Sequence, residues 1–464
     1  MKQLFKRKQL DYDTLHNNEL DRVIGPWQLT QMGIGAIVGA GIFITPGIIA
    51  ATTAGPSVVL SYVIAAIVCS LAALCYAEFA STIPIAGSAY TYIYAMFGEL
   101  PGWLIGWSLV SEYLFAVSSV AVSWSAYFQS LIAGFGLHLP TYLTISSGSS
   151  GHKGFGIDIT AGIVILIIGF LLSNGMNESA KLNAAMVVIK ILVILLFVVV
   201  AAFYVKPTNF HPFMPHGFHG TFQGASIAFY AYLGFDAVSS AAAETKNPQK
   251  TMPKGIIGSL IVATILYVLV SLVMVGSVSY TRLNVNDPVA FVLHVINQNW
   301  AAGIISLGAI IGMTTVILVM SYGGTRLLFA MSHDGLLPKT FSKINQHTKV
   351  PIKGTWIFTL IAAAIAMFVP LSTITELVNV GTLLAFASVS LGIIFLRKHQ
   401  ELKGQAAFKV PFYPILPIIS LLACLSLLFN LKPLTWIIYA IWIVLGLTVY
   451  GLYGYKHSKV QKND

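Results

Sequence analysis

The chain has 464 residues, of which 56% are hydrophobic and 9% are charged, and its formal net charge is +10. Soluble proteins carry about 25% charged residues, and a soluble fold of this length has too little interior to bury so much apolar surface. Because the lysines and arginines lie between apolar runs and form no single basic patch, we expect membrane lipid around the chain and no nucleic acid partner.

The apolar runs predict an all-α membrane protein with twelve spanning helices, because about 20 apolar residues cross about 30 Å of hydrocarbon. Two shorter helices are expected outside the hydrocarbon, at Tyr90–Phe97 and Asp287–Gln298. The polar first 21 residues predict no cleavable signal peptide. The expected spans are 28–53, 57–80, 101–132, 157–174, 181–205, 221–241, 253–280, 300–330, 354–370, 375–397, 411–430 and 433–454.

The distribution of positive residues predicts the orientation in the membrane. If the N-terminus is cytoplasmic, 21 of the 26 lysines and arginines fall on that side, four fall on the other side and Lys190 lies within a span. Positively charged loops favour the cytoplasmic side. We therefore expect a multi-pass protein of the bacterial inner (plasma) membrane with both termini in the cytoplasm.

The first span contains four glycines within nine residues, from Gly33 to Gly41. Each glycine inside a helix costs about 1 kcal/mol relative to alanine. Close packing through a GxxxG pair is the alternative reading, and it explains Gly35 and Gly39 better than it explains Gly39 and Gly41 together. The glycines therefore predict an interruption of this helix near mid-membrane.

The sixth span carries a second glycine-interrupted run, Phe229-Tyr-Ala-Tyr-Leu-Gly-Phe-Asp236. If the chain repeats after residue 205, this span opens a second set of five helices, and an odd number of spans turns the second set upside down. Interrupted segments at matching places in two halves are the best sequence indication of a transporter site.

Two such interruptions would expose helix ends of opposite polarity. A half-helix that begins near Ile42 directs free N–H groups and the positive end of its dipole toward the midplane, which suits a carboxylate. A half-helix that ends near Tyr232–Gly234 presents free carbonyl groups, which suit an ammonium group. The pair therefore predicts a site for a zwitterion, and its candidate binding residues are Val38, Gly39, Ala40, Gly41, Ile42, Phe229, Tyr230, Ala231, Tyr232 and Gly234.

Lys190 lies about nine residues into the fifth span, hence about 14 Å deep at 1.5 Å per residue. A lysine there costs at least about 2.5–3.5 kcal/mol, and burial disfavours its charged form, so Lys190 is a candidate proton carrier. The expected neighbours are carbonyl groups between residues 35 and 38 and the hydroxyl of Thr314 or Thr315. The alternative is a static ammonium group that bridges the first and eighth spans.

Three carboxylates also fall within or at the ends of spans. Glu112 is equally compatible with a pocket-wall carboxylate and with a protonated acid hydrogen-bonded between helices. Asp236 is expected to cap the inner half of the sixth span, because an acid stabilises a helix N-terminus. Glu78, near the cytoplasmic end of the second span, is expected to pair with a cation from a loop.

Aromatic side chains flank both expected interruptions. Most aromatics in membrane helices pack or face lipid, but those beside an unwound segment are candidate gates over a bound molecule. Phe43 and Phe235 are such candidates, and Phe229 is the favoured one because it lies five residues before Gly234.

No Walker loop, HExxH or GxSxG motif occurs, so we expect neither an enzyme nor a bound cofactor. His211, His216 and His219 lie in a short loop without a nearby cysteine or acid, so no metal site is expected. A channel would show a repeated filter segment. A retinal protein would have about seven spans, and a major-facilitator transporter would not require interrupted first and sixth spans.

Several runs resemble the amino acid–polyamine–organocation superfamily, and within it the cationic amino acid transporter branch. These are Ile37–Phe43, Tyr230–Val238, Glu244–Pro248, Met252–Gly255 and Arg326–Pro338. The resemblance covers the whole chain and implies a LeuT-like inverted repeat of five plus five helices with discontinuous helices 1 and 6. It also implies that Lys190 stands where sodium-coupled relatives hold their cation, and that a proton drives uptake.

The resemblance divides the chain into a cytoplasmic N-terminal segment (1–27), a first repeat (28–205), a second, inverted repeat (221–397), two additional helices (411–454) and a cytoplasmic tail (455–464). The expected function is proton-coupled symport of neutral or broad-range L-amino acids by alternating access. The alternatives are a permease for cationic amino acids and an amino acid/amine exchanger.

Overall fold

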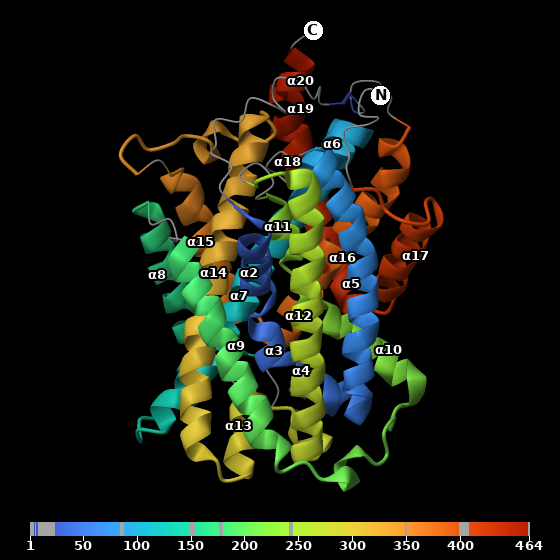
Figure 1. Cartoon of the computed structure of the whole chain (residues 1–464). Helices are drawn as coiled ribbons and strands as arrows, with labels where there is room; N and C mark the ends of the chain where they lie inside the picture. The colour runs from blue at the N-terminus through green and yellow to red at the C-terminus, as the bar shows by residue number, and fades with distance from the viewer. Residues whose placement is uncertain are drawn as a thin grey trace.

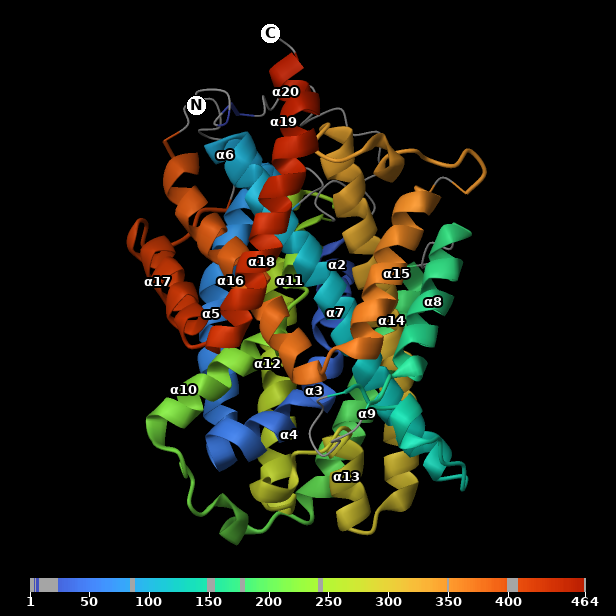
Figure 2. The same cartoon turned by 180° about the vertical axis from the view of Figure 1, so that it is seen from behind.

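The structure is a computed structural model, and it describes residues 4, 6–7, 24–83, 88–147, 155–175, 180–240, 245–348, 350–398 and 408–462. These residues form a bundle of helices that run mostly along one long axis (Figures 1 and 2). Within this described part, the β-type pairing consists of one isolated bridge between Ile24 and Thr245. The described part of the chain is therefore all-α, as the apolar runs predict.

Seven helices in the described part are long and apolar enough to cross a membrane. They lie within Thr45–Thr82, Glu99–Ala133, Ala185–Ala202, Pro248–Ser277, Asn299–His333, Leu371–Leu396 and Pro433–His457. Three shorter apolar helices, Ile159–Ser173, Ile352–Phe368 and Ile415–Phe429, accompany them. These lengths fit a multi-pass membrane protein, because about 20 apolar residues span the hydrocarbon.

Most α-helices fall close to the predicted spans. Those of the first half are α2 (Pro26–Ile37), α3 (Ala40–Phe43), α4 (Thr45–Ile49), α5 (Val58–Thr82), α6 (Ser88–Phe97), α7 (Glu99–Ala133), α8 (Ile159–Ser173) and α9 (Ala180–Ala202). Those of the second half are α10 (Gly217–Ala228), α11 (Phe235–Ser240), α12 (Pro248–Ser277), α13 (Pro288–Val295), α14 (Asn299–His333), α15 (Ile352–Phe368), α16 (Leu371–Leu396), α17 (Ile415–Phe429), α18 (Pro433–Val449), α19 (Tyr455–His457) and α20 (Lys459–Lys462).

Side-chain size and polarity separate central helices from peripheral ones. The central helix α5 buries small residues such as Ala65, Ala72 and Ala73, which allow neighbouring helices to approach closely. The peripheral helix α18 instead exposes Ile437 and Ile441. Exposed aliphatic side chains are stable in lipid, so this surface fits a bilayer.

The first and sixth predicted spans are each divided into short helices. From α2 through α3 to α4 the chain runs from the end of the bundle that holds α6 and α20 toward the opposite end (Figures 1 and 2). From α10 to α11 it runs in the reverse direction (Figures 1 and 2). The two interrupted segments are therefore antiparallel.

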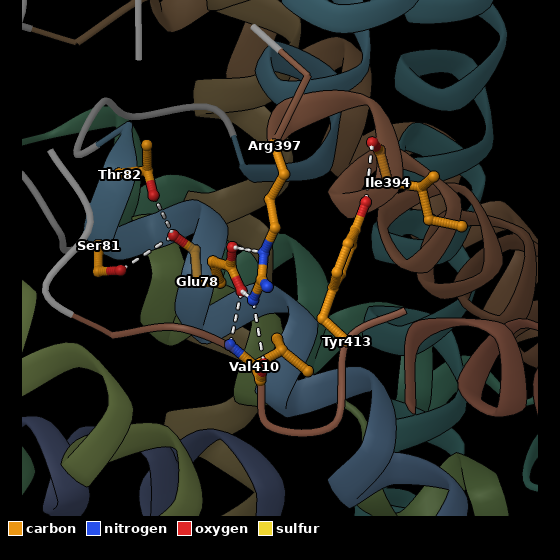
Figure 3. Close-up of polar contacts among 7 residues, drawn as sticks. All are labelled: Glu78, Ser81, Thr82, Ile394, Arg397, Val410 and Tyr413. Carbon is orange, nitrogen blue, oxygen red and sulfur yellow. Dashed lines mark hydrogen bonds and ion pairs between the residues drawn. The ribbon is translucent and has the colours of Figure 1, made fainter. Parts of the chain in front are cut away.

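An ion pair fastens the end of α5 to the end of α16. Arg397 donates from Nε and Nη2 to the Glu78 carboxylate at 2.8 and 2.7 Å, and the Val410 amide donates to the same carboxylate at 2.6 Å (Figure 3). The guanidinium also lies 4.2 Å from the ring centroid of Tyr413. The side chain of Glu78 is only 3% exposed. This pairing confirms the prediction that Glu78 pairs with a cation from a loop, because Arg397 follows the last residue of α16.

Candidate functional site

The first interruption lies at Val38 and Gly39. α2 ends at Ile37, Val38 leaves the helical region at φ −79° and ψ 87°, and α3 begins at Ala40. The amide of Gly39 donates to the carbonyl of Ile37 at 3.0 Å, which is a local turn and not a helical bond. The first amides of α3 have no intrahelical acceptor, so their dipoles point into the gap between α2 and α3.

The second interruption lies at Leu233 and Gly234. α10 tightens into a 3-10 turn, η6 (Phe229–Tyr232), after which Leu233 is extended at φ −60° and ψ 147°. Gly234 then adopts φ +106°, a conformation that disfavours residues with a Cβ atom, and α11 begins at Phe235. The carbonyl end of η6 therefore faces the middle of the bundle.

The two interruptions pack directly against each other. A Cβ atom added to Gly41 would lie 2.6 Å from Cα of Ala231, and one added to Gly234 would lie 2.9 Å from the carbonyl carbon of Ala36. Because each glycine lacks a side chain, the backbone of the other segment can pack directly against it. The positive end of α3 and the carbonyl end of η6 consequently lie side by side, the arrangement that the glycine pattern predicts.

Tyrosine hydroxyls from two neighbouring helices bind carbonyl groups at the interruptions. Tyr267 of α12 lies 2.9 Å from the carbonyl oxygen of Ile37 and 2.5 Å from that of Ala231, so its single proton links the two segments. Tyr62 of α5 donates to the carbonyl of Gly41 at 3.2 Å and shares a 2.5 Å hydrogen bond with Thr45. Sequence reasoning missed Tyr62 and Tyr267. A buried hydroxyl in mid-span is the signal that could have identified them.

The aromatic candidates gather around a side chain that the sequence did not single out, Phe386 of α16. Its ring centroid lies 5.5 Å from Phe229, 4.7 Å from Phe235 and 5.2 Å from Tyr76. All four rings are buried. Phe229 is therefore one member of an aromatic cluster that closes over the second interruption.

The remaining binding and gating candidates are also buried. Tyr230 shares a 2.7 Å hydrogen bond with Ser119 of α7, and the carbonyl of Phe43 accepts a 2.8 Å hydrogen bond from Tyr127. The phenolic oxygen of Tyr232 donates to the backbone carbonyl of Tyr62 at 3.0 Å. The other buried candidates at the two interruptions are Val38, Gly39, Ala40, Gly41, Ile42, Ala231 and Gly234.

Lys190 of α9 is 0% exposed, and its ammonium group donates to the carbonyl of Gly35 at 2.9 Å. That acceptor is one of the carbonyl groups that the sequence predicts. The aliphatic stem packs on α14, where a Cβ atom added to Gly312 would lie 3.0 Å from Cγ of Lys190. Lys190 therefore joins the end of α2 to α9 and α14.

The two threonines expected beside Lys190 make different contacts. Thr314 accepts a 3.0 Å hydrogen bond from the indole of Trp124, and Thr315 donates to the carbonyl of Gly312 at 2.8 Å. α14 approaches α9 through Gly312, and a residue two positions further is rotated by about 200° around the helix. Thr314 consequently faces α7, whereas Thr315, three positions from Gly312, lies nearer the face that meets Lys190, so a pairing of Lys190 with a threonine hydroxyl stays a prediction.

Glu112 and Asp236 bring two carboxyl groups into the same buried region. Glu112 is 4% exposed, and its Oε2 atom has no hydrogen-bond partner in the described part of the chain. Asp236 is likewise buried, at 2% exposure. Asp236 stands in the first turn of α11, one residue inside the helix, so the expected cap is shifted into the first turn, where the helix dipole still favours an acid.

The family model for the amino acid permease family matches residues 24–451. The chain belongs to the amino acid permease family. This permease is 49% identical to the methylthioribose transporter of Bacillus subtilis, with all of both chains covered. It is also 49% identical to the branched-chain amino acid permease BcaP of Bacillus subtilis, over 97% of this chain and 96% of the relative.

The vacuolar cationic amino acid transporter 2 of Arabidopsis thaliana is 38% identical over 86% of this chain and 63% of the relative. The resemblance noted in the sequence is thereby confirmed at the level of the family. The cationic transporters are more distant than the two Bacillus proteins. The motif run that begins at Glu244 lies partly outside the described residues, so its geometry does not enter the site.

Proposed function

We propose that this permease imports neutral amino acids together with a proton across the bacterial plasma membrane. The observation that carries the proposal is the direct packing of the two helix interruptions. In this proposal the chain forms twelve spanning helices, the two antiparallel interrupted segments open inverted repeats of five helices, and both termini are cytoplasmic. Alternating access follows when the two segments tilt against the rest of the bundle.

The helix ends at the interruptions supply opposite partial charges for a zwitterion. The first amides of α3, at Ala40 and Gly41, bind the α-carboxylate, and the carbonyl end of η6 binds the α-ammonium group. The Tyr267 hydroxyl already donates to the carbonyl of Ala231, which marks that oxygen as an acceptor directed toward the site. An arriving ammonium group takes over this role from the tyrosine.

The surroundings of the cargo side chain favour an aliphatic group. Phe229, Phe235 and Phe386 present an apolar wall beside the second interruption. An apolar pocket gains about 25 cal/mol for each Å² of apolar surface that it removes from water. This wall, together with the similarity to a branched-chain amino acid permease, supports isoleucine, valine and leucine as cargo.

Lys190 is proposed to carry the coupling proton. In its protonated form the ammonium group donates to the carbonyl of Gly35, two residues before α2 ends. Loss of the proton removes a charge-assisted hydrogen bond, which is stronger than a neutral one. Protonation of Lys190 therefore favours the conformation in which α2 is held against α9.

Methylthioribose is the second candidate cargo, because the Bacillus subtilis transporter named for it matches this chain over its whole length. A neutral thiosugar carries neither an ammonium nor a carboxylate group. It would gain little from helix ends of opposite polarity, whereas a zwitterion engages both. The packed interruptions thus favour an amino acid.

Uptake into proteoliposomes tests the proposal. Radiolabelled isoleucine, alanine, lysine and methylthioribose are each offered with and without an inward proton gradient. Accumulation of isoleucine that the gradient stimulates and that Lys190→Gln abolishes is the expected result. Gradient-driven uptake of methylthioribose without any amino acid uptake would replace the proposed cargo, and equal uptake with and without the gradient would refute proton coupling.

A further inference from the structure

A cavity of about 290 Å³ opens between the far end of α7, the segment that follows it and the loop that precedes α13. Its polar lining residues are Gln129, Ser130, His138, Asn286 and Asp287. The rest of the lining is alanine and leucine. This volume lies at the lower end of small-molecule sites, so it suits a molecule the size of an amino acid.

Asp287 supplies the negative charge of this cavity. Asp287 lines the cavity together with Ser130, and partial burial raises the pKa of its carboxyl group above the ordinary value of an aspartate. Among the described residues, no lysine or arginine forms an ion pair with this carboxylate. The carboxylate can therefore accept further hydrogen bonds from a cation.

The cavity adjoins the first interrupted segment through α7. Tyr127, next to the lining of the cavity, donates to the carbonyl of Phe43 at 2.8 Å, and the two rings are 5.8 Å apart. Pro288, which follows Asp287, packs on Gly47 of α4. A molecule in the cavity would thus lie one side chain away from the outer end of the interruption.

We propose that this cavity is an outer subsite that holds small ammonium compounds, amino acids above all, on Asp287 before they reach the interruptions. The inference rests on the proposed function, since it assigns the loop of α13 to the external side. The ammonium group pairs with the Asp287 carboxylate. The apolar lining receives the aliphatic side chain, and Gln129 and His138 face the rest of the ligand.

Thiol labelling at the mouth of the cavity tests the subsite directly. His138 is exposed, whereas Cys69, Cys75 and Cys424 are buried, so a His138→Cys variant gives one accessible thiol for a membrane-impermeant reagent. External isoleucine or 3-methylbutylamine, offered at about four times its Kd, should slow labelling roughly fivefold, because only about one fifth of the cavities stay free. 4-Methylpentanoate, which has no ammonium group, should give no protection.

A second substitution in the His138→Cys variant identifies the group that causes this protection. Asp287→Asn should abolish protection, Asp287→Glu should retain it, and Asn284→Ala, an exposed position of the same loop outside the cavity lining, should leave it unchanged. Gly41→Val, which obstructs the interruption, should also leave protection intact. Protection that survives Asp287→Asn, that is lost in Gly41→Val, or that 4-methylpentanoate also produces would overturn the proposal.

Transport kinetics give a second test, in a chain that keeps His138. Asp287→Asn should raise the KM for external isoleucine by roughly fivefold with the maximal rate maintained, because the lost pairing weakens capture and not translocation. If Asp287→Asn and Asn284→Ala have the same KM for external isoleucine, the proposed subsite does not exist. Failure of the unaltered permease to move any amino acid would instead refute the proposed function, so the two failures are distinguishable.

Discussion

Replacement of Gly41 by alanine should weaken substrate binding, because it would force the two interruptions apart. The added Cβ atom would lie 2.6 Å from Cα of Ala231, whereas ordinary contacts are 3.4–4 Å. The obstructing atom belongs to the backbone, so one segment must shift by roughly 1 Å. Overpacking of this kind costs about 1–3 kcal/mol, which corresponds to about five- to 150-fold in apparent affinity.

Isoleucine counterflow in proteoliposomes measures this effect without a proton gradient, so that binding and coupling are separated. The matched control is Gly303→Ala in α14, where an added Cβ atom meets nothing within 4 Å. The control should keep the affinity of the unaltered chain and gain helix stability. If Gly41→Ala binds isoleucine as tightly as Gly303→Ala, the two interruptions do not form the binding site.

Three further predictions follow from polar contacts described above. Lys190→Gln should abolish accumulation driven by a proton gradient and preserve counterflow exchange; an intact pH response in that variant would contradict the coupling role. Tyr267→Phe leaves backbone carbonyl groups without their donor, which costs about 1–3 kcal/mol, and a lower thermal unfolding midpoint in detergent is the expected measurement. Arg397→Ala strands the buried Glu78 carboxylate and should destabilise the protein by about 3–5 kcal/mol. Lys432→Ala should cost less than about 1 kcal/mol in the same assay, because the Lys432 side chain is 63% exposed and the buried Glu376 keeps its hydrogen bond from Thr435. Equal midpoints for the two variants would show that the greater burial of Arg397 does not matter.

Local composition was sufficient to predict most of the helices and the places where two of them break. Spans are readable because hydrocarbon demands continuous apolar runs, and interruptions are readable because glycine weakens a helix wherever it clusters. The structure accordingly interrupts the chain at Val38–Gly39 and at Leu233–Gly234. Lys190 was identifiable for a similar reason, since a lone cation in an apolar run is costly.

Contacts between helices could not be predicted in the same way. Tyr62, Tyr267 and Phe386 lie on helices that carry no break, and their roles depend on which face of each helix meets the interruptions. Thr314 shows the same limit, because a shift of two positions from Gly312 turns the side chain toward a different neighbour. Sequence spacing gives the angle around one helix, but not the identity of the helix that packs on it.

The reciprocal fit of Gly41 on Ala231 and of Gly234 on Ala36 restricts how a transport cycle can proceed. No side chain separates the two backbones at these points, so turning either segment in place would press a Cα or carbonyl atom against its counterpart. In the proposed cycle this contact favours movement of the two segments together, and independent gating by either one would first require the two backbones to separate.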